Sequence, residues 1–147
     1  AYDTARSLGF RVQKRSDNAM VSPQTQVWIG DSMGELFAYY LTGSTAFVGG
    51  SLVDTGCQNI IEPIACGVPT VFGFSTYNFS SACENALKAG AAVQVGSADE
   101  WRQTVETWLS DDSLRARFAA QAQAFVAQHR GASSRMAQEV AKAVQAV

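Results

Sequence analysis

Short apolar runs alternate with longer segments of helical spacing along this chain. The short runs are apolar throughout and rich in β-branched and aromatic residues, which is typical of strands covered on both faces of a parallel sheet. Five runs predict strands, at residues 10–13, 27–29, 45–48, 70–72 and 91–95.

The segments between these strands predict crossover helices at residues 34–41, 60–66 and 79–88. Each strand–helix–strand step has the length that a βαβ unit needs. The order of elements therefore predicts an α/β fold, a Rossmann-like open parallel sheet with flanking helices.

The C-terminal part of the chain is predicted to be helical. Ser97 and Glu100 have the spacing of a capping box, which predicts a helix to about Leu109. Gly131 predicts the end of a second helix, and residues 135–147 predict an Ala-rich third helix. The second helix has a stripe of apolar positions that should face the core: Leu114, Phe118, Ala122, Phe125 and Val126.

Composition narrows the class of protein. A chain of 147 residues, 47% hydrophobic and 16% charged, fits one globular domain with a core. The net charge of −2 predicts no broad basic surface, so no nucleic-acid partner is expected. No apolar run of about 18 residues predicts a membrane span. Three cysteines and one histidine lack the spacing of a zinc site, which favours reduced, mostly buried thiols: Cys57, Cys66 and Cys83.

Ligands of open α/β sheets bind beyond the carboxyl ends of the strands, and three loops leave strands in that direction. In the first, at residues 30–35, Ser32 and Glu35 have capping-box spacing. The helix that starts there could hold an anion, or the pair could only cap it. Gly34 in the first turn favours a ligand, because glycine lowers helix propensity and often marks a close approach.

The second and third loops add a glycine pair and a carboxylate. Gly49 and Gly50 at a strand end let backbone approach a phosphate, although no P-loop lysine follows and a flexible turn is the alternative. Asn59 and Glu62 have capping-box spacing, which a helix start alone explains. A carboxylate at this edge can also accept hydrogen bonds from a ribose diol. Together the loops predict a nucleotide site.

Three motifs stand in a fixed order: Asp-Ser-Met-Gly-Glu-Leu at 31–36, Phe-Val-Gly-Gly-Ser-Leu-Val at 47–53, and Asn-Ile-Ile-Glu-Pro at 59–63. Gly-Val-Pro at 67–69 and Asn-Phe at 78–79 follow. In this order the chain resembles the C-terminal half of a 3-deoxy-D-manno-octulosonic acid (Kdo) transferase, a glycosyltransferase of the two-Rossmann GT-B fold. Gly-Gly-Ser-Leu-Val together with Asn-x-x-Glu-Pro is the specific part of the resemblance.

That family moves Kdo from CMP-Kdo to a lipid A precursor (lipid IVA) in lipopolysaccharide synthesis of Gram-negative bacteria. The resemblance implies that residues 1–147 form the donor-binding domain, truncated at its N-terminal edge and inactive alone. The acceptor domain, the acidic catalytic base and the part that associates with the cytoplasmic face of the inner membrane would precede it. No cofactor or metal is expected. The alternatives are another GT-B enzyme with a UDP- or GDP-sugar donor, or a non-catalytic nucleotide-binding module.

The resemblance also implies the site residues. Glu62 would accept hydrogen bonds from the ribose hydroxyls, and the helix start at Asn59 would face the phosphate. The residues that would contact CMP are Met33, Gly34, Glu35, Asn59, Ile60, Ile61 and Glu62. The residues that would line the cleft are Gly49, Gly50, Ser51 and Gln58.

The chain departs from the family at two places. Cys57 and Gln58 replace the usual Gly-His, and Asp54 replaces a proline. A histidine donor near the phosphate or the Kdo carboxylate is therefore missing. Gln58 can donate a hydrogen bond there but carries no charge.

Overall fold

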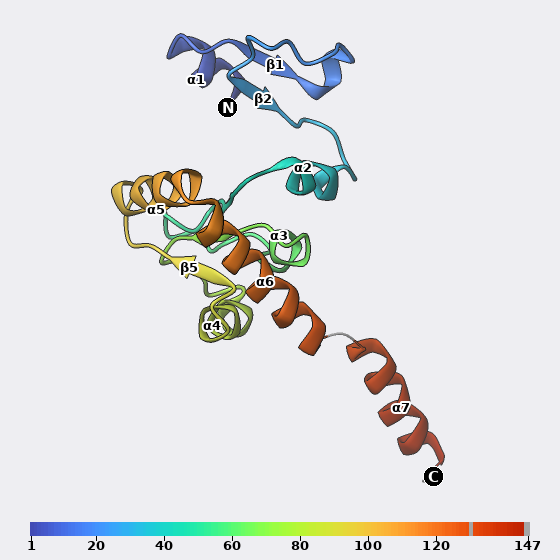
Figure 1. Ribbon diagram of the computed structural model, residues 1–147. Coiled ribbons are helices and arrows are strands. Elements are labelled where there is room, and N and C mark those ends of the chain that lie inside the picture. The colour runs from blue at the N-terminus through green and yellow to red at the C-terminus, as the bar shows by residue number, and fades with distance from the viewer. Residues whose placement is uncertain (130, 146–147) are drawn as a thin grey trace. The chain divides into compact units, whose positions relative to one another are not determined.

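The computed structural model describes residues 1–129 and 131–145 and divides into two compact units. Unit 1 is Ala1–Thr42 and unit 2 is Gly43–Val147. Each unit contains a parallel sheet with helices (Figure 1). None of the helices in the described residues is both long and apolar enough to cross a membrane.

Unit 1 is a two-stranded parallel sheet with short helices around it. Its elements are α1 (Tyr2–Ser7), β1 (Val12–Lys14), the 3-10 helix η1 (Arg15–Asp17), β2 (Val27–Ile29) and α2 (Leu36–Thr42). β1 pairs with β2 in register from Val12↔Val27 to Lys14↔Ile29. No side chain of unit 1 is fully buried, although parallel sheets occur almost only where both faces are covered.

Unit 2 is a three-stranded parallel sheet in the order β3-β4-β5. Helices connect the strands, so all three strands end at the same edge of the sheet. The elements are β3 (Ala46–Val48), α3 (Ile61–Ala65), β4 (Thr70–Phe72), α4 (Ser80–Lys88), β5 (Ala92–Gln94), α5 (Ala98–Ser110), α6 (Asp112–His129) and α7 (Ala132–Gln145).

Both faces of the sheet in unit 2 are covered. Phe72 of β4 packs into a core with residues of α3, α4 and α6, whereas its neighbour Val71 packs into a second cluster with Trp108 of α5. α5 and α4 accordingly lie on opposite sides of β5 (Figure 1). Every residue of β4 is buried, which explains why the neighbouring residues Val71 and Phe72 are both apolar rather than alternating with polar ones.

The α/β class, the parallel pairing and all five strands are confirmed. Each unit has its own set of paired strands, β1-β2 in unit 1 and β3-β4-β5 in unit 2. Hydrophobic periodicity reports burial, but it carries no information on which strands are neighbours. The pattern therefore predicts that the strands exist but not their order in a sheet.

The helix starts differ from the prediction by one or two residues. α2 begins at Leu36 rather than at residue 34, because Gly34 has a φ of +80° and lies outside the helix. α3 and α4 begin at Ile61 and Ser80, one residue late in each case.

The predicted C-terminal helices are confirmed. Ser97 caps α5 by accepting a hydrogen bond from the Glu100 amide at 3.2 Å, whereas the Glu100 carboxylate accepts from the Gly96 amide and not from Ser97. Ala122 and Phe125 of α6 are buried, and the remaining apolar stripe of α6 packs against the two core clusters. α7 starts at Ala132, and residues 146–147 of the predicted helix lie outside the described residues.

Candidate functional site

The loops that follow β3 and β4 are joined by one buried hydroxyl group. Ser51 is fully buried, and its Oγ donates to the Val48 carbonyl at 2.6 Å and accepts from the Gly73 amide at 2.7 Å. The Ser75 amide donates to the Ser51 carbonyl at 2.9 Å. A Cβ at Gly73 would lie 2.3 Å from that carbonyl oxygen, so only glycine fits. The two strand ends therefore form one connected edge.

The loop between β3 and α3 closes on itself. The Gln58 amide donates to the Gly49 carbonyl at 3.1 Å, so the predicted glycine pair and the start of the third loop lie side by side. Gly50 has a φ of +80°, and a Cβ there would lie 2.3 Å from the Gly56 carbonyl oxygen. Apart from Gly49 and its two chain neighbours, no atom of the described residues lies within 4 Å of the position that a Cβ on Gly49 would take, so the space on that side of the backbone is open.

Asn59 and Glu62 interact, but not as the predicted capping box. Ile60 is the N-cap residue of α3, so Asn59 lies one residue before the N-cap. From there, Asn59 Oδ1 accepts a hydrogen bond from the Ile61 amide at 3.0 Å. Asn59 Nδ2 donates to Glu62 Oε1 at 3.3 Å, so the carboxylate binds a side chain instead of the backbone. Glu62 Oε2 accepts no hydrogen bond within the described residues. Ile60 is fully buried in the core.

Two residues absent from the predicted site hold this loop in place. Ser75 Oγ accepts from the Gly56 amide at 3.0 Å and donates to Asp54 Oδ1 at 3.3 Å. Asn78 Nδ2 donates to the Cys57 carbonyl at 2.6 Å. Both are short polar residues that follow strand β4, and this position is the signal by which the sequence could have indicated them. The residues to which they bond lie about 20 positions away in the chain, so the sequence does not show these contacts.

Of the two residues that replace the usual Gly-His, Cys57 lies in the core and Gln58 lies at the surface. Cys57 is fully buried with its Sγ 3.8 Å from Cys83 Sγ, and the side chain of Gln58 is exposed. Burial, together with the contact to Cys57, raises the pKa of Cys83 to about 12, so this thiol stays protonated. Only Gln58 of the pair can reach a ligand.

Residues 33–35 lie in unit 1, before α2. Met33 is 97% exposed, and the space around the Gly34 Cα is open. The Glu35 carboxylate accepts from Arg15 at 3.1 Å, from the Tyr39 hydroxyl at 3.0 Å and from the Ser32 hydroxyl. The hydrogen bond from Ser32, then those from Arg15 and Tyr39, lower the pKa of Glu35.

The capping box predicted at Ser32 and Glu35 is therefore wrong. The Glu35 carbonyl accepts from the Ala38 and Tyr39 amides, which puts Glu35 itself at the start of α2. Ser32 bonds to the carboxylate and to the Tyr39 hydroxyl instead of to a backbone amide. The three-residue spacing of Ser32 and Glu35 instead allows their side chains to bond to each other and to Tyr39.

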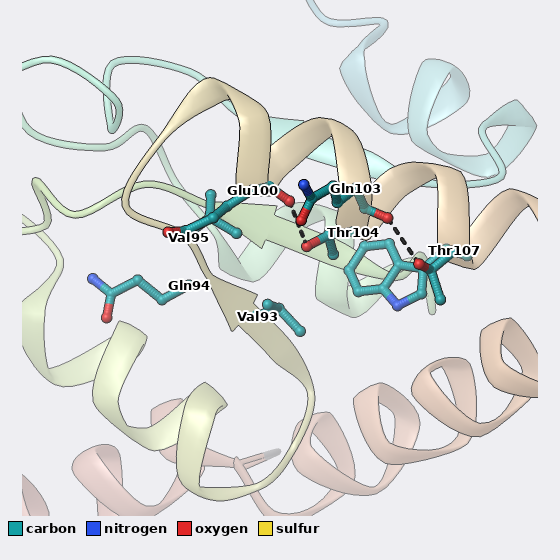
Figure 2. A pocket seen from close by; sticks show the side chains of 8 residues that line it. Val93, Gln94, Val95, Glu100, Gln103, Thr104 and Thr107 are labelled. Carbon is teal, nitrogen blue, oxygen red and sulfur yellow. Dashed lines mark hydrogen bonds between the residues drawn. The ribbon is translucent and has the colours of Figure 1, made fainter.

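A hollow of about 380 Å³ lies in unit 2 between β5 and α5 (Figure 2). The hydroxyls of Thr104 and Thr107 donate back to the Glu100 and Gln103 carbonyls, each at 2.8 Å, so they are already used within the helix. Among the described residues no group of three or more histidine, cysteine, aspartate or glutamate side chains could hold a metal ion. The lining residues are Val93, Gln94, Val95, Glu100, Gln103, Thr104, Thr107 and Trp108.

Residues 9–125 match the family model of the group 1 glycosyl transferases. The chain belongs to this family. Among group 1 glycosyl transferases and their relatives, it is 35% identical over 135 residues to the 3-deoxy-D-manno-octulosonic acid transferase of Haemophilus influenzae, covering 91% of this chain and 32% of that protein. It is 36% identical over 131 residues to the Bordetella pertussis transferase of the same name, covering 88% and 31%. The chain thus spans about a third of the length of these relatives.

A solved structure shares this group 1 glycosyl transferase fold. It is the C-terminal CMP-Kdo binding domain of WaaA from Acinetobacter baumannii, with a TM-score of 0.81 and 29% identity, covering 85% of this chain and 65% of that chain. The resemblance to Kdo transferases carried by the three motifs is thereby confirmed.

Ser51→Ala should lower the free energy of unfolding by about 1–3 kcal/mol, because it leaves the Gly73 amide and the Val48 carbonyl unpaired in the interior. Thr55→Ala is the control, since its exposed hydroxyl also donates to a loop carbonyl, that of Gly50 at 3.0 Å. That variant should change stability by less than about 0.5 kcal/mol. Urea unfolding measures both, and equal effects would contradict the role of Ser51.

The pKa of Glu35, measured by NMR titration, should lie below its ordinary value and rise toward it in Ser32→Ala. A lowered pKa in the folded state stabilises the fold at neutral pH, and this stabilisation is lost as the pH falls below about 4. Ser7→Ala, whose exposed hydroxyl bonds within α1, should leave the Glu35 pKa unchanged. A Glu35 pKa unaffected by Ser32→Ala would refute the network.

Proposed function

We propose that this chain is the donor-binding domain of a longer glycosyltransferase that moves Kdo from CMP-Kdo to a lipid A precursor (lipid IVA). The observation that carries the proposal is the likeness over 85% of the chain to a domain that binds CMP-Kdo, at 29% identity. The relatives at 35% and 36% identity are transferases of the same sugar. Lipopolysaccharide synthesis is the process that such an enzyme serves.

CMP would contact the loops at the carboxyl edge of the sheet in unit 2. For residues 33–35 of unit 1, a contact with CMP stays a prediction from the resemblance to Kdo transferases. Support comes from the adjacency of residues 49–51 and 58–62, which lie where open α/β sheets bind ligands. Within the part of the chain that the structure describes, one carboxylate oxygen of Glu62 has no hydrogen-bond partner, and we propose that it accepts from the ribose hydroxyls. The open backbone at Gly49 suits the approach of a phosphate.

In this proposal the acceptor hydroxyl attacks the anomeric carbon of Kdo. Its proton passes to an acidic residue elsewhere in the longer protein, the new C–O bond forms, and the bond from Kdo to the CMP phosphate breaks. The present chain holds the leaving CMP. Gln58 can donate a hydrogen bond to the phosphate or to the Kdo carboxylate without adding positive charge.

The lipid acceptor and the membrane would be met by the remainder of the longer protein, at the cytoplasmic face of the inner membrane. The chain spans about a third of its relatives, and residues 1–147 would therefore supply only the donor half of the site.

The full-length protein should be stabilised against thermal unfolding by CMP more than by UMP or GMP at equal concentrations. Ligands that bind only the folded state stabilise it by about 2.7 kcal/mol at a concentration of 100 Kd. A thermal-shift series with the three nucleotides measures the order. Stabilisation by UMP or GMP equal to or above that by CMP would point to a UDP- or GDP-sugar donor instead.

Glu62→Gln in the full-length protein should weaken CMP binding by roughly 1–2 kcal/mol, about 5- to 30-fold in Kd, because a charge-assisted hydrogen bond is lost. Calorimetry measures the affinity. Glu106→Gln is the matched control, since Glu106 lies on α5 and pairs with Arg102 at 2.8 Å. Unchanged CMP affinity in Glu62→Gln would show that Glu62 serves only its contact with Asn59.

A further inference from the structure

Tyr77 is presented at the surface of unit 2 by a loop whose backbone is fixed. Its side chain is 66% exposed, in the turn between β4 and α4. The Tyr77 carbonyl accepts from the Ser80 hydroxyl at 3.2 Å, and the next residue, Asn78, donates through Nδ2 to the Cys57 carbonyl at 2.6 Å. An exposed aromatic side chain on a backbone held in this way loses little conformational entropy when a ligand binds to it.

The bond between Asn78 and Cys57 brings Tyr77 beside Gln58. Asn78 follows Tyr77 in the chain, and Cys57 precedes Gln58. The two exposed residues are therefore the direct neighbours of the two groups that this 2.6 Å bond joins. Glu62, which we propose for the ribose, follows Gln58 on the other side. In this succession of bonded residues, Gln58 stands between Tyr77 and the ribose carboxylate.

The loops at this edge offer neutral donors and no cation for an anionic sugar. Neither residues 49–62 nor residues 73–79 include a lysine, an arginine or a histidine. A carboxylate bound here would therefore accept from hydroxyl or amide groups. In these two loops, as the structure describes them, the exposed side-chain donors that make no hydrogen bond are those of Gln58 and Tyr77, whereas Thr55 and Asn78 donate to loop carbonyls.

We propose that Tyr77 and Gln58 form the subsite for the Kdo group of the donor. The Tyr77 hydroxyl donates a hydrogen bond to the Kdo carboxylate, and the ring packs against C–H groups of the sugar. Kdo is joined directly to the phosphate, so this subsite adjoins the open side of Gly49, whose carbonyl accepts from the backbone amide of Gln58. The inference rests on the proposed function and adds to it a residue that recognises the sugar rather than the nucleotide.

Steady-state kinetics of the full-length protein, at saturating acceptor, separates recognition of the sugar from recognition of the nucleotide. CMP lacks the Kdo group, so Tyr77→Phe should raise KM for CMP-Kdo by about 5- to 10-fold and leave the inhibition constant of CMP within about 2-fold. Tyr77→Ala, which also removes the ring, should raise KM further. An interaction made equally in the ground state and the transition state changes KM and leaves kcat unchanged.

Tyr2→Phe is the matched control, since it removes a hydroxyl from α1 and keeps the ring that Lys14 approaches to 4.3 Å. It should change neither constant. An unchanged KM in both Tyr77 variants would overturn this proposal and leave CMP-Kdo as the donor. Parallel rises in KM and in the CMP inhibition constant would also overturn it, because Tyr77 would then act on the nucleotide. A wild-type protein that does not turn over CMP-Kdo would overturn the proposed function as well.

Discussion

The hydroxyl of Ser51 is the interaction on which the geometry of the strand ends depends. It is fully buried and bonds to the carbonyl of Val48 and to the amide of Gly73, so the last residue of β3 and the first residue after β4 cannot move apart. A buried polar group without its partners costs far more than an exposed one. The loop that leaves β3 therefore starts from a fixed point, and Ser75 and Asn78 hold it further along.

Glu35 and Glu62, the acidic residues of the two predicted loops, differ in how many acceptor positions of their carboxylates remain available to a ligand. Glu35 accepts from three neighbours that together lower its pKa, so its carboxylate is already paired within unit 1. Among the described residues, Glu62 accepts a hydrogen bond from Asn59 alone, at 3.3 Å. A carboxylate has about four acceptor positions, so Glu62 retains more capacity for a ligand hydroxyl. This difference arises from packing and was not visible in the two motifs, which have the same spacing.

The sequence predicted the parts of the fold that local burial determines. Val71 and Phe72 are both apolar because both faces of β4 are covered, and the cap at Ser97 is a contact between residues three positions apart. Pairing partners were not predictable in this way, since the order of the strands depends on contacts between distant residues. The serine–glutamate spacing failed at Ser32 because a carboxylate three residues on can bind a side chain as well as a backbone amide.

The absence of a side chain at Gly73 has a consequence for how this region can vary among related proteins. A Cβ there would lie 2.3 Å from the Ser51 carbonyl oxygen, and one at Gly50 would lie at the same distance from the Gly56 carbonyl oxygen. Replacement at either glycine would require the facing backbone to move, so glycine should be retained at both positions. Val53, exposed at 58% in the same loop, is under no such restriction. Substitutions that avoid a clash with the backbone are therefore expected at exposed positions of the loop such as Val53, while the two glycines hold its backbone path.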